Sequence, residues 1–235
     1  MPAVTDSLQT AVQDTARAVA QATPPAVTET STNLWEMIVK GGPVMIPLAI
    51  FLLVAVYIII ERLIVINRSL RVPHNFMNNI RDFILSGNID SARAVCKTTN
   101  APVARMIEKG INRIGRPLAD IEKSIENVGK LEVAKLEKNL NLLGIIAGIA
   151  PMMGFIGTIL GVIRIFYNIG LAGTIEVKYV ADGLYEKMVS SASGLIIGII
   201  AYAAYHLLSG MIDKAIFKME SNSVDFIDVL QEPSK

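Results

Sequence analysis

Three long apolar stretches constrain this chain more than any other feature of its sequence. Residues 44–66 carry no charge before Glu61 and Arg62, residues 140–166 carry only Arg164, and residues 188–211 contain no Asp, Glu, Lys or Arg. A bilayer core needs about 20 residues of helix to cross it, and a buried helix of a soluble protein rarely runs so long without charge. We therefore predict three membrane-spanning helices, in keeping with a hydrophobic content of 52%.

The basic residues predict how the chain crosses the membrane. Of the 22 Lys and Arg residues, 14 lie between Arg62 and Lys138. Positive charge is retained on the cytoplasmic side of a membrane. We therefore expect the N-terminus to be periplasmic, and both this basic segment and the C-terminus to be cytoplasmic.

The expected fold is all-α: an integral membrane protein with three transmembrane helices, the second and third extended into the cytoplasm as long helices. Apolar residues at three- and four-residue spacing predict cytoplasmic helices at 76–86, 90–98 and 102–114. From Pro117 to Phe166 only Gly129 interrupts this rhythm before the second span, so we expect one continuous helix there. The predicted segments are an extracytoplasmic tail and interfacial helix (1–43), the first span (44–66), a cytoplasmic helical domain (67–139), the second span (140–166), a short periplasmic loop (167–187), the third span (188–211) and a cytoplasmic C-terminal helix and tail (212–235).

Several classes of function are disfavoured by what the sequence lacks. Aromatic residues make up 6% of the chain, which argues against a stacking surface for nucleic acid. Phosphate-loop, zinc-ligand and Rossmann patterns are absent, as are the paired carboxylates of a membrane enzyme. We expect no enzymatic activity, cofactor or metal. We expect Cys96, the single cysteine, to be a reduced thiol, and the tail, with no basic start or apolar run, not to be a signal peptide.

The spans contain no acidic residue near a membrane midplane, although a proton carrier normally needs an ionisable group there. Unless His206 serves, the chain cannot supply that group alone. Small residues and hydroxyls recur instead on one face of each of the last two spans. We expect the glycines to pack helices together in a ring of subunits; they are Gly154, Gly157, Gly161, Gly194 and Gly198.

The hydroxyls of these faces leave two interpretations open. They belong either to a surface that only packs, or to a site that offers Thr158 and Ser191 to a polar group of another chain. Thr158 lies about 12 Å inside Phe166 and Ser191 about 7 Å inside Glu186 by helical rise, so both fit one layer in the outer half of the membrane. Ser190 and Ser193, beside Ser191, are lesser candidates. Arg164 is another, and we favour an anchor at the membrane interface over a gate. Tyr202, with Tyr205 and His206, is favoured as an interfacial residue over a proton relay.

The second and third spans resemble the signatures of a known family. Leu136-Glu137-Lys138-Asn139-Leu140 followed by Ala150–Gly161 is similar to the second-span pattern LE+xL…APxxGxxGTxxG of the MotA/TolQ/ExbB proton-channel family. Residues 180–195 resemble the start of its third span. The three-span layout is that of the ExbB/TolQ branch, and the resemblance covers approximately residues 43–209.

The resemblance implies a motor subunit in the bacterial inner membrane, driven by the proton-motive force. Subunits would form a homo-oligomeric ring, a pentamer in the family, around single-span helices of the ExbD/TolR type that carry a membrane Asp. A TonB-like periplasmic protein would be the client, so that the motor energises TonB-dependent outer-membrane transport. Thr158 and Ser191 would be pore-facing hydroxyls and Glu186 the acidic group at the outer mouth.

The chain departs from the family pattern at two positions. Ser191 replaces the usual Thr and keeps its hydroxyl, whereas Asp182 stands at a common Pro position. The alternatives are a TolQ-like energiser of envelope maintenance and a passive membrane scaffold. The long extracytoplasmic tail favours the ExbB-like assignment.

Overall fold

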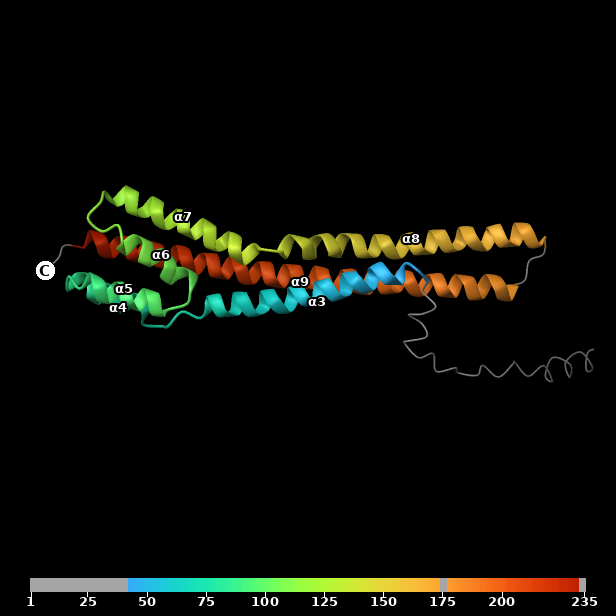
Figure 1. The fold of residues 1–235 in the computed structure, drawn as a ribbon, viewed down its shortest axis with the longest axis horizontal. Coiled ribbons are helices and arrows are strands. Elements are labelled where there is room, and N and C mark those ends of the chain that lie inside the picture. Colours follow the sequence, from blue (N-terminus) through green and yellow to red (C-terminus); the bar gives the residue numbers. More distant parts are fainter. Residues whose placement is uncertain (1–41, 174–176, 233–235) are drawn as a thin grey trace, which may run out of the picture. The chain divides into compact units, whose positions relative to one another are not determined.

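A computed structural model describes residues 42–173 and 177–232, leaving aside the side chain of Glu186. Every element within these ranges is a helix (Figure 1). The predicted all-α class is therefore confirmed. The N-terminal tail and the interfacial helix expected around Trp35 lie outside the described residues.

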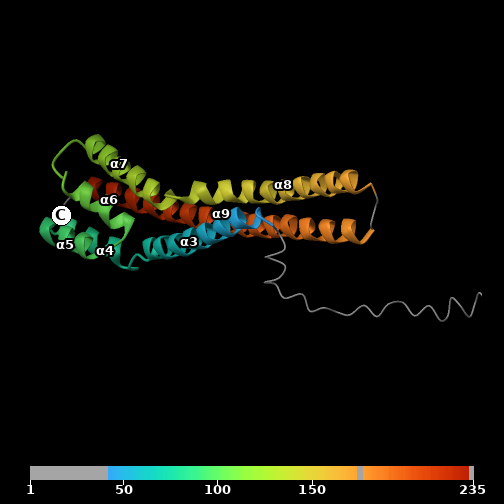
Figure 2. The ribbon, with the colours of Figure 1, turned by 45° about the vertical axis from the view of Figure 1, so that its right-hand side comes forward.

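Three of the helices are long and apolar enough to cross a membrane. The apolar stretches lie in α3 (Met45–Leu70), α8 (Leu140–Ala172) and α9 (Val177–Gln231). The prediction of three membrane-spanning helices is therefore confirmed. Figure 1 and Figure 2 both show α8 and α9 side by side, with α3 packed against them. Leu48 and Ile58 of α3, Leu143 of α8 and Leu208 of α9 lie in their shared core. The outward faces are apolar too, as a lipid-facing surface requires.

A second core holds the remaining helices to the C-terminal part of α9. The helices are α4 (Phe76–Leu85), α5 (Ile89–Thr98), α6 (Pro102–Ile111) and α7 (Leu118–Glu137). Phe76, Ile107, Ile125 and Phe226 are buried where they meet. The three short helices were predicted from apolar spacing, and their existence is confirmed. We call this unit the α4–α7 domain.

Cys96 lies inside the core of the α4–α7 domain. The residue is only 2% exposed, and burial together with the negative charge of Glu108 raises the pKa of its thiol to about 12. The thiol is therefore protonated at neutral pH and packs as a small apolar side chain.

The prediction of one continuous helix from Pro117 to Phe166 is wrong at one point. Helix α7 ends at Glu137 and α8 begins at Leu140, because Asn139 adopts a left-handed conformation with φ of 63°. Asparagine is the residue after glycine that best tolerates this region. The predicted loop 167–187 is also shorter than expected, since α8 runs to Ala172 and α9 starts at Val177.

Arg62 ties α3 to the break between α7 and α8. Its buried guanidinium donates to the backbone oxygen of Lys135 at 3.0 Å and to Oε1 of Glu61 at 2.5 Å. The last carbonyls of a helix lack intrahelical partners and carry partial negative charge. Arg62 therefore caps the C-terminus of α7.

Replacing Asn139 with valine should destabilise the break, because a β-branched residue is strained at positive φ. We expect a loss of about 1–2 kcal/mol, measured by thermal unfolding of the detergent-solubilised chain followed by circular dichroism. Asn139→Gly should keep wild-type stability.

The matched control is Asn141→Val, because Asn141 is exposed and lies within α8. Asn and Val have similar helix propensities, so this change should have little effect. Equal stability of Asn139→Val and Asn141→Val would show that the left-handed turn is not required.

Candidate functional site

Helices α8 and α9 approach each other at backbone distance through their glycines. A Cβ atom placed on Gly194 would lie 2.6 Å from the backbone oxygen of Ala150 and 3.0 Å from Cα of Gly154. One placed on Gly154 would lie 3.1 Å from Cα of Ser191. No side chain fits between backbones at this spacing, so the glycines set the separation of the two helices.

The remaining glycines of the predicted stripe continue the same contact. Gly157 faces the hydroxyl of Ser190, Gly161 receives the aliphatic stem of Lys187, and Gly198 faces the ring of Pro151. All five glycines thus pack α8 against α9 within one chain. Our expectation that these glycines pack a ring of subunits stays a prediction.

The hydroxyls around this contact differ in accessibility. Ser190 is fully buried, and its Oγ donates to the backbone oxygen of Lys187 at 2.9 Å. Thr158, Ser191 and Ser193 are half-buried. Because Ser190 is enclosed by α8, Thr158 and Ser191 are better placed to meet a group from another chain.

The half-buried hydroxyls at Thr158 and Ser193 donate to their own helices. Thr158 Oγ1 lies 3.1 Å from the backbone oxygen of Gly154, and Ser193 Oγ lies 2.9 Å from that of Val189. A hydroxyl has one proton and two lone pairs. Each can therefore still accept a hydrogen bond from an incoming acid, and can donate one to an anion if it rotates away from its carbonyl.

The helix pairing fixes the relative depth of Thr158 and Ser191. Since Gly157 faces Ser190 and Gly161 faces Lys187, Thr158 is level with the stretch between Lys187 and Ser190. At 1.5 Å per residue, Thr158 and Ser191 lie within roughly one helical turn of each other along the helix axes. The two residues therefore lie at similar depth in the helix pair.

Lys187 is a charged residue near this layer that the sequence interpretation did not single out. Its stem fills the notch at Gly161, and it lines a cavity of about 320 Å³ with Arg164, Asn168 and Asp182. The signal was available, because Lys187 lies one turn before Ser191 on the glycine face of α9. Arg164 is exposed and lines this cavity together with Gly161.

Tyr202 and Glu186 also lie on α9, after and before the hydroxyl layer along the helix. Tyr202 is 60% exposed, and its ring centroid lies 4.4 Å from that of His206. Glu186 lies on α9 one residue before Lys187, and its side chain is outside the description. Among the described residues, no three His, Cys, Asp or Glu side chains are grouped to hold a metal ion.

The sequence of this chain is similar to those of known proteins. A family model described as the MotA/TolQ/ExbB proton channel family matches residues 98–221. A "Putative biopolymer transport protein ExbB homolog" of Methanothermobacter thermautotrophicus is 28% identical over 57% of this chain and 47% of its own length. The chain thus spans about half of that relative.

Two further relatives extend the comparison. "Putative biopolymer transport protein ExbB-like 3" of Synechocystis is 27% identical over 68% of this chain and 77% of its own length. "Biopolymer transport protein ExbB" of Helicobacter pylori is 35% identical over 37% of this chain and 59% of its own length.

Alanine at Gly194 should weaken the helix pair, because its Cβ would overlap backbone atoms that cannot move aside. We expect a loss of roughly 1–3 kcal/mol and a lower unfolding temperature in detergent. Gly148→Ala is the control, since nothing lies within 4 Å of a Cβ at that position. If the two variants unfold at the same temperature, the close approach of α8 and α9 is not what stabilises them.

Proposed function

Because this chain belongs to the MotA/TolQ/ExbB proton channel family, we propose that it is a motor subunit that converts proton flow into mechanical work. Family members are channel and transport subunits, so the chain is a membrane transport component and not an enzyme. Its relatives are described as biopolymer transport proteins of the ExbB type. We infer the same class of energiser for this chain.

The observation that carries the proposal is a membrane unit with hydroxyls but no acidic group of its own. No Asp or Glu occurs at 44–60, 138–175 or 187–212. A protein that conducts protons needs an ionisable carrier within the membrane. We infer that a partner of the ExbD/TolR type, with one span and one membrane Asp, supplies the carboxylate.

The proposed assembly is a homo-oligomeric ring of this chain around the partner helices. A pentamer would follow the family pattern. The exposed apolar faces of α3 and α8 leave room for contacts with lipid and with neighbouring subunits, since the glycine face is used within the chain. The ring would place one Thr158–Ser191 layer per subunit around the central carboxylates.

The hydroxyl layer lowers the cost of ionising that carboxylate. An isolated carboxylate in a low-dielectric site incurs a large desolvation penalty. Thr158 and Ser191 would donate to the anion and accept from the acid. Ser190 is enclosed by α8, keeps its hydrogen bond to the backbone oxygen of Lys187 and would not bind the carboxylate. Glu186 would attract protons at the outer mouth.

The proposed location is the bacterial inner membrane, with the N-terminus periplasmic and the α4–α7 domain cytoplasmic. The basic concentration between Arg62 and Lys138 supports this orientation. The client would be a TonB-like periplasmic protein, and the ExbB-type relatives favour it over the TolQ-like alternative. A passive scaffold would explain the glycines but gives no reason for hydroxyls on the accessible side of the contact.

Thr158→Val should abolish proton-driven work while leaving assembly intact. Valine keeps the shape of threonine but cannot donate to a carboxylate. The measurement is energised uptake across the outer membrane in cells that depend on this chain, together with co-purification of the single-span partner. Ser191→Ala should be milder because it leaves Thr158 in place, and the double variant should be nearly inactive.

Thr158→Ser is the control, since it restores the hydroxyl without the methyl group and should retain most activity. Full activity of an assembled Thr158→Val ring would leave the hydroxyl without a role and favour the scaffold.

Cysteine labelling should place residue 10 outside and residue 86 inside the inner membrane. Cys96 cannot report, because its buried thiol stays protonated, so both reporters need a Cys96→Ser background. Ser86 lies in an exposed turn after α4. A membrane-impermeant maleimide should label Thr10→Cys in intact cells and Ser86→Cys only after permeabilisation. Labelling of Ser86→Cys in intact cells would reverse the orientation.

A further inference from the structure

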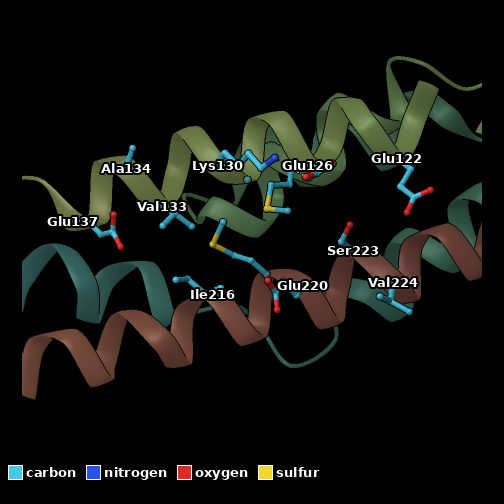
Figure 3. Close-up of a pocket in the computed structure, with 13 residues that line it drawn as sticks. Glu122, Glu126, Lys130, Val133, Ala134, Glu137, Ile216, Glu220, Ser223 and Val224 are labelled. Carbon is cyan, nitrogen blue, oxygen red and sulfur yellow. Dashed lines mark ion pairs between the residues drawn. The ribbon is translucent and has the colours of Figure 1, made fainter. Parts of the chain in front are cut away.

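A groove in the α4–α7 domain lies far along the chain from the hydroxyl layer. It has a volume of about 500 Å³ and runs between α7 and α9, as Figure 3 shows. The floor is apolar, with Met106 of α6 beneath, Val133 on the α7 side and Met219 on the α9 side. Methionine side chains are flexible and adapt to ligands of varied shape.

Carboxylates surround this apolar floor. Glu122, Glu126 and Glu137 project from α7 and Glu220 from α9 (Figure 3). Lys130, also on the rim, pairs with Glu126 at 2.6 Å, which lowers the pKa of that carboxyl through hydrogen bonding and charge. The other three carboxylates are exposed, and form no ion pair within the part of the chain that the structure describes. The rim therefore keeps three uncompensated negative charges.

The dimensions of the groove match a helix. Glu122 and Glu137 are 15 residues apart on α7, which is about 22 Å at 1.5 Å per residue. A partner helix of about four turns would place its apolar side on the methionines and its basic side chains against the rim. This is the common helix-in-groove mode of recognition, in which anchors at i, i+3, i+4 and i+7 enter an apolar groove.

We propose that this groove binds a basic amphipathic helix of a cytoplasmic partner. The negative charge of the rim favours a partner with lysine and arginine side chains, and the apolar floor favours a helix with one apolar face. The inference rests on the proposed function only for the orientation that makes the domain cytoplasmic. Binding does not involve the proton path, so it gives the motor a separate point of attachment.

The test uses the full-length chain in phosphatidylcholine nanodiscs and a fluorescent 15-residue peptide of leucine and lysine. Leucine occupies one helical face and lysine the other. Fluorescence anisotropy should show saturable binding that weakens as salt rises. A scrambled peptide of the same composition should bind at least tenfold more weakly.

Two groove variants separate charge from shape. The triple change Glu122→Gln, Glu137→Gln and Glu220→Gln should reduce affinity at least tenfold. Ala134→Trp should do the same by filling the groove at unchanged charge. The control neutralises three exposed carboxylates outside the groove, Asp82→Asn, Asp213→Asn and Asp228→Asn, and should bind like wild type. Circular dichroism confirms that each variant is folded.

Equal binding by the triple variant, by Ala134→Trp or by the scrambled peptide would overturn the proposal. It would also be overturned if the peptide fails to bind. Disulfide dimers of Ala134→Cys in membranes would then show that a second copy covers the groove. Thr158→Val should bind the peptide normally. A failure of the proton-path proposal is thereby distinguished from a failure of this one.

Discussion

The backbone contact between α8 and α9 is the interaction on which the membrane part of this protein depends. Apolar side chains gain little by leaving lipid for a helix surface, so helices in a bilayer are held by close packing. Gly154 and Gly194 let two backbones meet at distances where a single methyl group would collide. The same approach buries Ser190 and leaves Thr158 and Ser191 at the accessible edge. The glycines therefore decide which hydroxyls are available.

The break at Asn139 has a comparable role for the α4–α7 domain. A straight continuation of α8 would run on beside α9, but the left-handed turn lets α7 take its own direction and leaves space for α6. Helix α6 fits closely there, since a Cβ on Gly110 would lie 2.6 Å from Phe226 of α9 and 2.7 Å from Ile125 of α7. Arg62 holds the turn in place from α3. The groove between α7 and α9 is a consequence of this arrangement.

The sequence allowed the spans and the short helices to be predicted because hydropathy and apolar period are local properties. The break was missed because Asn139 has no feature that distinguishes it from an ordinary helical residue such as Asn141. Its tertiary setting, with Arg62 donating to the carbonyl of Lys135 near the end of α7, favours the turn. The glycines were recognised as packing residues, but a stripe does not say whether its partner belongs to the same chain. Ser190 and Ser191 differ by about 100° around α9, and which one is enclosed depends on where α8 lies.

The hydrogen bonds of the accessible hydroxyls suit a transient contact. On the proposed mechanism, Thr158 gives up a neutral hydrogen bond to Gly154, worth about 1 kcal/mol, for one to a carboxylate, worth about 1.5–3 kcal/mol. The net gain of about 0.5–2 kcal/mol favours the anion over the protonated acid. A gain of that size helps the carboxyl to release its proton without holding the anion tightly in place. When the carboxyl is protonated again, the hydroxyl returns to its helix and the partner can move to the next subunit.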